Sequence, residues 1–377
     1  MSPPGPATGP AVPLADLARA TPLGPALARA LTAALAPRRW EPWNGYNDHR
    51  GYPSPRSLYL TDAVIQAGRQ RWLVDPVRLG AHPAGQAAAR HGPAAAGPVT
   101  VELHAHPGRL PEEYGTLREA VALLEAGHVS AALTEAARAE GLRPMVRSVS
   151  DDGQPADPGG QPVVLVGLAP DGTASWPRRR VRAPRSSGIA VNGQLSADPR
   201  PLPAQSWQAF LEACRAVPAG SLATRPEASR LRHRLAVGHV AGAAEGRYEW
   251  RAGRLTRYGD PALKELQDAF GSGPDVIDVA GLNVVWVMTA SLAAIVRAEG
   301  AAAYPQTLLA AGAIAQHVCS AAALNGMFCR PVPSIEEPAT EAAMGVPAAE
   351  DAVYMLLIGR PRVLDFSYDL TDPQEQS

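Results

Sequence analysis

The sequence predicts an α+β fold made of two related halves in one chain. One observation is an apolar, β-branched run at Val284–Ser291 (VVWVMTAS), followed by a helix of small residues within Gly312–Pro331. A second is a fainter copy of this pattern 185 positions earlier, where Val99–His106 (VTVELHAH) lies over Val284–Ser291. The same shift places Gly127 over Gly312, Ala136–Ala137 over Ala321–Ala322, and Gly141 over Gly326. So long a period indicates a duplicated domain, because solenoid repeats run about 20–50 residues.

The other elements follow from periodicity and turn signals. Each repeat helix is expected to run for about four turns and to end at glycine, with proline just beyond. Further helices are expected as two short ones in Leu14–Ala36, then at Pro111–Glu140, Leu202–Cys214 and Pro261–Phe270. Strands are expected at Thr61–Gln66, Gln70–Asp75, Val99–His106, Val163–Leu168, Leu235–Val240, Arg247–Trp250, within Val276–Ala290, and at Ala352–Ile358.

The remaining stretches are expected to be tail and loops. Residues 1–13 form a Pro-rich tail, and loops are expected at Gly80–Pro98, Asp151–Gln161 and Pro333–Glu341. The predicted organisation is a tail with short helices at 1–36, a first half at 37–177, and a second half at 178–377.

Composition indicates an ordinary soluble globular protein. The 377 residues are 46% hydrophobic and carry a net charge of −1, which gives no electrostatic case for nucleic acid or an anionic membrane. Lys264 is the only lysine among 35 basic residues, so a lysine base or Schiff-base lysine would have to be Lys264. No uninterrupted apolar run reaches the ~18 residues needed to span a bilayer.

The cysteines and the N-terminus predict a reduced, cytoplasmic protein. Cys214, Cys319 and Cys329 are odd in number and form neither CxxC nor a Cys/His metal spacing. The Pro/Ala-rich N-terminus has neither the basic nor the apolar region of a secretory signal.

Four stretches then carry a resemblance to a known family. Tyr52–Tyr59 (YPSPRSLY) looks like a Pro-Ser-(Gly)-Gly-x-Leu-Tyr segment, with Pro55, Arg56 and Ser57 in place of glycines. Glu113–Gly141 is similar to a Lys-Tyr-Gly…Glu-Ala-Gly-His helix, although Glu113 stands where lysine is expected. Arg185–Ser187 resembles an Arg-Arg-Ser opening, and Ile358–Arg362 (IGRPR) a closing Leu-Gly-x-Pro…Arg.

These motifs, in this order, resemble the flavin-dependent nitroreductase-like fold. Within it they resemble the peptide-azoline dehydrogenases of streptolysin, microcin and thiopeptide biosynthesis. The resemblance implies two nitroreductase-like halves, each a mostly antiparallel sheet wrapped by helices. In that family FMN lies in the interface of an obligate dimer. Here both subunits would lie in one chain as a pseudo-dimer, with one complete and one decayed FMN site.

The resemblance assigns residues to the complete site. Phosphate contacts would come from Arg185, Ser186, Ser187 and Arg362, since guanidinium forks and hydroxyl donors suit a phosphate. The other half would supply Pro53, Ser54, Arg56 and Ser57, and Cys329, Arg330 and Pro331 would pass the isoalloxazine edge. Each assignment has an alternative. Arg185–Ser187 could be a linker with solvated arginines, Pro53-Ser54 an ordinary turn before a strand, and the stretch from Cys329 a helix C-terminal loop without a ligand. In the second half, the position of the Pro-Ser segment is taken by RPEASRLRHR (225–234), so the site that includes it would be the decayed one.

The proton-accepting residue stays open among three candidates. The family's azoline loses a proton to a base and a hydride to flavin. Its Lys-Tyr pair is broken here, which leaves Tyr114, Glu113 and, in the second half, Tyr304. The alternatives are core or interface packing for Tyr114 and a solvated helix-start acid for Glu113.

Other features receive a structural interpretation. Glu102, His104 and His106 alternate on one face of a strand, as an exposed strand surface also would, so no metal is assigned. Gly127 and Gly312 are expected to permit close helix packing across the pseudo-dimer interface, and Cys329 is interpreted as a small apolar filler.

By resemblance, the expected function is FMN-dependent oxidation of thiazolines or oxazolines to azoles in a ribosomally made peptide, of the thiopeptide type, with oxygen as electron acceptor. The implied partners are the azoline-containing peptide and the cyclodehydratase that makes the azolines. The sequence contains no recognisable leader-peptide-binding module. The alternatives are another flavin oxidoreductase of this fold, or a flavin-free scaffold protein of the same complex.

Overall fold

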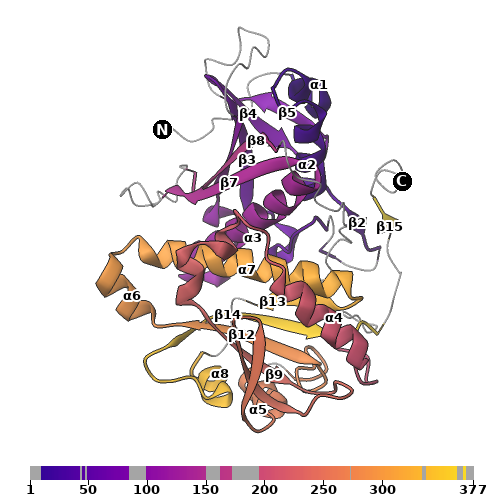
Figure 1. Ribbon diagram of the computed structural model, residues 1–377, viewed down its shortest axis with the longest axis vertical. Helices are drawn as coiled ribbons and strands as arrows, with labels where there is room; N and C mark the ends of the chain where they lie inside the picture. The colour runs from indigo at the N-terminus through magenta and orange to yellow at the C-terminus, as the bar shows by residue number, and fades with distance from the viewer. Residues whose placement is uncertain are drawn as a thin grey trace.

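The computed structural model describes residues 10–42, 45–46, 49–84, 99–149, 162–171, 195–271, 273–332, 337–362 and 368–370. Two antiparallel sheets stand at opposite ends of an elongated molecule, and the helices α3 (Leu117–Ala139) and α7 (Ala303–Leu324) lie side by side between them (Figure 1). This arrangement confirms the predicted α+β class and its two halves. The expected boundary at 177/178 lies outside the described residues.

The strand order shows the duplication directly. The first sheet has the order β1-β5-β4-β3-β6-β8-β7 and the second β11-β10-β9-β12-β14-β13. Adding six to each label of β5-β4-β3-β6-β8-β7 gives the second order. The strands of the first sheet are β1 Val12–Pro13, β3 Thr61–Ala67, β4 Gln70–Asp75, β5 Gly80–Pro83, β6 Val99–Ala105, β7 Leu142–Ser148 and β8 Val164–Pro170. Those of the second are β9 Arg232–Val237, β10 Gly246–Arg251, β11 Arg254–Gly259, β12 Val284–Ala290, β13 Phe328–Val332 and β14 Asp351–Gly359.

The shorter helices pack on both faces of the second sheet and against α3 and α7. They are α1 Leu14–Arg19, α2 Pro25–Leu35, α4 Ala204–Arg215, α5 Leu263–Ala269, α6 Leu292–Glu299 and α8 Glu337–Met344. Alternate residues of β12 enter two different cores: Val284, Trp286 and Met288 pack with α4 and α7, whereas Val285 and Val287 pack with α5 and α8. Because both faces of this strand are buried, its sequence is continuously apolar rather than alternating.

Glycines allow the two long helices to touch. A Cβ atom on Gly127 would lie 3.0 Å from the Gly312 Cα and closer still to the Leu309 carbonyl oxygen. A Cβ on Gly312 would meet the Leu124 carbonyl oxygen in the same way. Leu124 and Leu309 are 185 positions apart, as the two glycines are, so the contact has the symmetry of the repeat. The predicted close packing is confirmed.

Several predicted bounds were wrong. The repeat helices run for 23 and 22 residues, about six turns rather than four. The first begins at Leu117 rather than Pro111, because Gly115 takes a positive φ of 49°. The prolines beyond the helices do not end regular structure but lie in the edge strands β7 and β13, where a missing N–H is tolerated. Strands β5 and β11 were also missed.

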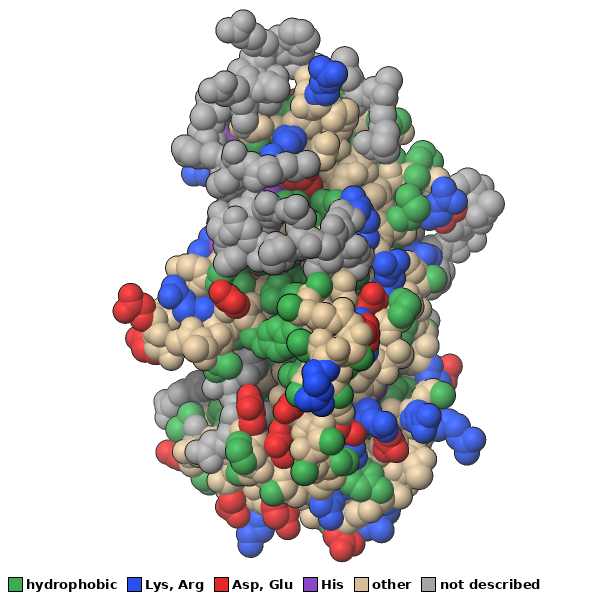
Figure 2. Space-filling view, turned by 90° about the vertical axis from the view of Figure 1, so that its left-hand side faces the viewer, with side chains coloured by type: hydrophobic (Ala, Val, Ile, Leu, Met, Phe, Trp, Pro, Cys, Tyr) green, Lys and Arg blue, Asp and Glu red, His purple; other side chains and the backbone are tan. Residues whose placement is uncertain are grey.

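By length and composition, α7 is long and apolar enough to cross a membrane. The sequence had not suggested this, because it contains no apolar run of ~18 residues without interruption. The most apolar window of α7 is 83% buried inside the molecule, as expected for the core helix of a soluble protein. On the face shown in Figure 2, Lys and Arg side chains are interspersed with Asp and Glu over the described residues. The C-terminal strand β15 (Tyr368–Asp369) pairs back with β2 (Arg39–Trp40), which ties the end of the chain to its first half.

The strand face with Glu102 and His104 is not exposed, contrary to the interpretation above. Both side chains are buried, and the Glu102 carboxylate is paired with Arg71 and, at 3.0 Å, with His104 Nε2. His106 is paired with Asp62, also at 3.0 Å. The alternation therefore reflects ion pairs within the sheet.

Candidate functional site

The loop before β3 has an unusual backbone. Arg56, Ser57 and Tyr59 have φ values of 51°, 53° and 49°, in the left-handed region that glycine adopts most easily. A non-glycine residue there costs about 1–2 kcal/mol. The loop therefore has a glycine-type conformation at Arg56 and Ser57, two of the positions where the resembled segment has glycines. Strain of this kind persists only where the surroundings determine the conformation, and it is typical of ligand-binding sites.

Glu125 of α3 holds this loop. Its carboxylate accepts hydrogen bonds from Ser54 Oγ at 2.6 Å and from the Thr61 N–H at 3.0 Å. Ser54 Oγ in turn accepts a hydrogen bond from the Tyr59 N–H at 2.8 Å. Burial raises the pKa of Glu125 to about 7, although these hydrogen bonds oppose the shift. The carboxylate belongs to the Glu-Ala-Gly-His stretch of the sequence, but sequence reasoning did not select it as a site residue.

Residues of both halves meet beside the loop. The Arg56 guanidinium carbon lies 5.6 Å from the centroid of the Tyr114 ring. Arg330, on β13 of the second half, is close enough to Tyr114 and Tyr46 to interact electrostatically with both. Burial lowers the pKa of Arg330, and the two tyrosines oppose this shift. The structure thus brings together three predicted groups: the Pro53–Ser57 loop, Tyr114 and the strand of Cys329–Pro331.

This region suits an anionic, planar ligand. Among the described residues, no carboxylate is paired with the Arg330 guanidinium, although Arg330 is only partly exposed and burial lowers its pKa. A buried cation normally has an anionic partner. The two arginines and the hydroxyl of Ser57 are the kinds of group that a flavin ring and phosphate require. The donor set therefore fits FMN.

The other predicted residues lie in different surroundings. Arg362 is exposed and donates from Nη1 to Ser196 Oγ at 3.2 Å, whereas Arg185, Ser186 and Ser187 lie outside the described residues. Glu113 is exposed in the short helical turn Glu112–Tyr114. Tyr304 is partly exposed near Glu337 and Glu119, and burial raises its pKa. Cys329 is buried, and burial raises the pKa of its thiol well above the usual range.

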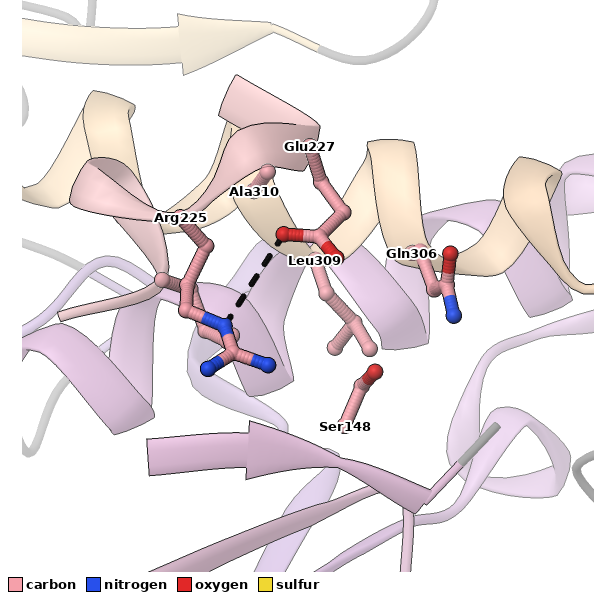
Figure 3. A pocket seen from close by; sticks show the side chains of 7 residues that line it. Ser148, Arg225, Glu227, Gln306, Leu309 and Ala310 are labelled. Carbon is pink, nitrogen blue, oxygen red and sulfur yellow. Dashed lines mark ion pairs between the residues drawn. The ribbon is translucent and has the colours of Figure 1, made fainter. Parts of the chain in front are cut away.

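The equivalent position in the second half is closed. The stretch before β9 forms the short helical turn Pro226–Arg230, and none of residues 222–231 has a positive φ. Arg230 is paired with Glu299 and donates to the Ala303 carbonyl oxygen at 3.3 Å. Figure 3 shows Arg225 and Glu227 facing each other, with 3.9 Å between Nε and Oε2, across a cavity of about 10 Å³ beside α7. This volume holds about one water-sized probe.

The anchoring carboxylate is also missing there. The repeat places Ala310 at the position of Glu125, since 125 and 310 are 185 apart. Ala310 lines the small cavity together with Leu309 and Gln306 (Figure 3). The two sides of the interface are therefore unequal: over the described residues, the strained loop, its anchor and the partly buried Arg330 occur on one side and not on the other.

No family model and no curated protein matches the sequence. Among solved structures, a protein described as a nitroreductase from Anabaena variabilis superimposes with a TM-score of 0.72 at 15% identity, covering 94% of this chain and 92% of that one. A nitroreductase-type protein from Ralstonia eutropha gives a TM-score of 0.34 at 20% identity, over 48% of this chain and 87% of that one. The E. coli microcin synthetase complex McbBCD gives 0.37 at 12% identity, over 51% and 78%. The first match shows that the chain has the nitroreductase fold over nearly its whole length.

Proposed function

We propose that the protein is an FMN-dependent oxidoreductase that binds one flavin per chain, between its halves. The observation that carries the proposal is the asymmetry of the interface. One side has the left-handed Arg56–Ser57 loop anchored by Glu125 and faced by Arg330. The other side has an alanine in place of the anchor and is closed by its own ion pairs.

The reaction proposed is dehydrogenation of azolines to azoles in a ribosomally made peptide. Support for this substrate comes from the order of the motifs in the sequence. Bound FMN would accept a hydride from the azoline ring, and oxygen would serve as the final electron acceptor. The ring carbon must also release a proton, and Tyr114 is the candidate acceptor that lies beside the loop.

The side chains have separable roles in this proposal. Arg330 and Arg56 would bind the flavin and balance negative charge on it, while Arg185, Ser186, Ser187 and Arg362 would hold the phosphate. Ser54 and Glu125 would keep the loop in shape. The cyclodehydratase that makes the azolines is the proposed protein partner. Both the peptide and this partner would have to reach the interface from outside the chain.

The experiment is a flavin count followed by an assay. The purified protein is denatured, and released FMN is quantified per chain. One FMN is the expected result, and two would mean that the position around Arg225 and Arg230 also binds. No FMN, even after incubation with excess flavin, would leave a flavin-free scaffold. With one FMN, an azoline-containing peptide should lose two hydrogen atoms per ring by mass spectrometry. Retention of those hydrogens by a flavin-loaded protein would favour a different substrate for the same fold.

A further inference from the structure

A second cavity lies in the second half, away from the proposed flavin site. It has a volume of about 130 Å³ and lies between α4, the turn before β9, the strands β9, β10 and β12, and α7. Its walls include Ala228, His233, Trp250, Trp286 and His317. None of its lining residues belongs to the Pro53–Ser57 loop, α3 or β13. Nothing in the proposed flavin chemistry uses it.

The size of the cavity suits one small ring. An engineered cavity of about 150 Å³ in another protein binds benzene, and a water needs only ~10–15 Å³. A volume of about 130 Å³ therefore accepts one five- or six-membered aromatic ring with little space left over. A flavin or a peptide backbone would not fit.

Two indole rings form one corner of the cavity. The centroids of Trp250 and Trp286 are 5.8 Å apart, and their planes are inclined at 57°. The His233 ring packs edge-to-face on Trp286, with 5.7 Å between centroids and 81° between planes. Walls of this kind favour flat, polarisable ligands, which can stack on one ring and present an edge to another.

Hydrogen bonding determines which tautomer His233 adopts. Trp286 Nε1 can only donate, and it donates to His233 Nδ1 at 3.1 Å. The proton of the neutral imidazole must therefore be on Nε2. Burial lowers the pKa of His233 to about 4, so the ring is neutral near pH 7. Within the described part of the chain no acceptor is bonded to Nε2–H, so this donor is available to a ligand.

We propose that this cavity is a binding site for one neutral heteroaromatic ring with an in-plane acceptor, such as a thiazole, oxazole or pyridine. The indole corner would stack on the ring, and His233 Nε2–H would donate to its nitrogen. The proposal does not depend on flavin binding, because it uses none of the same residues.

The test is a titration of the full-length protein, as purified, with 4-methylthiazole, pyridine and benzene. Tryptophan fluorescence and calorimetry report binding, and Trp250 and Trp286 supply an optical signal in the walls. We expect saturable binding of all three rings, with the two heterocycles tighter. Thiazole-4-carboxamide then distinguishes two kinds of natural ligand. Its binding indicates a ring that is part of a peptide, whereas binding of the rings without the carboxamide alone indicates a free small molecule.

Two variants and a control locate the site. His233→Phe keeps an aromatic ring but removes the Nε2–H donor, together with the Nδ1 acceptor of the Trp286 N–H, so affinity for 4-methylthiazole should fall roughly 3- to 10-fold relative to affinity for benzene. Ala228→Leu fills the cavity and should abolish binding of every ring without unfolding the protein. Ala241→Leu, at an exposed position, should change neither. Absence of saturable binding at millimolar concentrations, or equal binding by Ala228→Leu and the unchanged protein, would overturn the proposal.

Discussion

His128 Nδ1 and Gln316 Oε1 lie 3.1 Å apart in the buried interface, one on α3 and the other on α7. Gln316 Nε2 donates to the Gly51 carbonyl oxygen at 2.8 Å, so Oε1 must be the acceptor and His128 Nδ1 the donor. His128 Nε2 then accepts from the Tyr354 hydroxyl at 3.1 Å. Burial lowers the pKa of His128 to about 4, which keeps the ring neutral. This chain of bonds joins the segment leading into the strained loop to β14 of the other half.

Replacing Gln316 should loosen the interface. Gln316→Leu leaves the His128 Nδ1–H and the Gly51 carbonyl oxygen without partners, at about 1–3 kcal/mol for each buried group. We expect the free energy of unfolding to fall by roughly 2–6 kcal/mol in urea denaturation. Tyr354→Phe removes a single bond and should cost less. If the urea concentration at the midpoint of unfolding is unchanged in both variants, water molecules must supply the hydrogen bonds that the side chains have lost.

The helix contact gives a second stability prediction. Gly312→Ala places a methyl group against the Leu124 carbonyl oxygen, which belongs to helix backbone and cannot move aside. Overpacking usually costs about 1–3 kcal/mol, and the rigidity of this contact places the change at the upper end or beyond. Gly108→Ala is the matched control, since no atom lies within 4 Å of its added Cβ. Thermal melting of the three proteins checks the prediction, and equal melting temperatures would contradict it.

The duplication could be predicted from the sequence because packing constrains it. Gly127 and Gly312 must remain glycines for the helices to touch, so the shift of 185 positions survives at that point. The buried strand at Val284–Ala290 was recognisable for a similar reason, since both its faces lie in cores. The edge strands β7 and β13 were not, because Pro144 and Pro331 indicate chain breaks unless the neighbouring strand is known.

The site was only partly accessible to sequence reasoning. The Pro53–Ser57 loop was selected by its order of residues, but the carboxylate that anchors it belongs to Glu125, more than 60 positions away in sequence. Burial of that carboxylate depends on how the halves pack, which no local pattern records. The tryptophan-lined cavity is likewise assembled from residues of α4, the turn before β9, the strands β9, β10 and β12, and α7.

Glu125 should make stability depend on pH. Its folded pKa of about 7 lies above the ordinary value of 4.5, so between these values the folded state binds the proton more tightly than the unfolded state. Stability from this group is therefore full below pH 4.5 and is lost as the pH rises to 7. Glu125→Gln should remove the loss and gain up to about 3 kcal/mol over the unchanged protein above pH 7, with little difference at pH 4. Urea denaturation at several pH values measures this difference, and a constant difference would refute the shifted pKa.

Flavin affinity should depend on Arg330 and not on an arginine of the closed side. Arg330→Ala removes a cation that has no carboxylate partner among the described residues, so FMN should bind roughly 10- to 100-fold more weakly, as expected for a charged hydrogen bond. Arg230→Ala, on the closed side, is the control and should leave the dissociation constant unchanged. Quenching of FMN fluorescence in a titration gives both constants. Equal weakening by the two variants would mean that the flavin is not placed asymmetrically.

Tyr114, Glu113 and Tyr304 can be separated by turnover. Only Tyr114 lies against the Arg56 side chain of the loop, whereas Glu113 is exposed and Tyr304 lies near Glu337 and Glu119. If Tyr114 accepts the proton, Tyr114→Phe should lower kcat about 10²–10⁴-fold, the usual contribution of a general base, while bound FMN per chain stays at one. Glu113→Gln and Tyr304→Phe should keep nearly full kcat. A Tyr114→Phe variant that loses flavin and activity together would instead assign this residue to packing at the interface, because a base removes a proton but does not hold the cofactor.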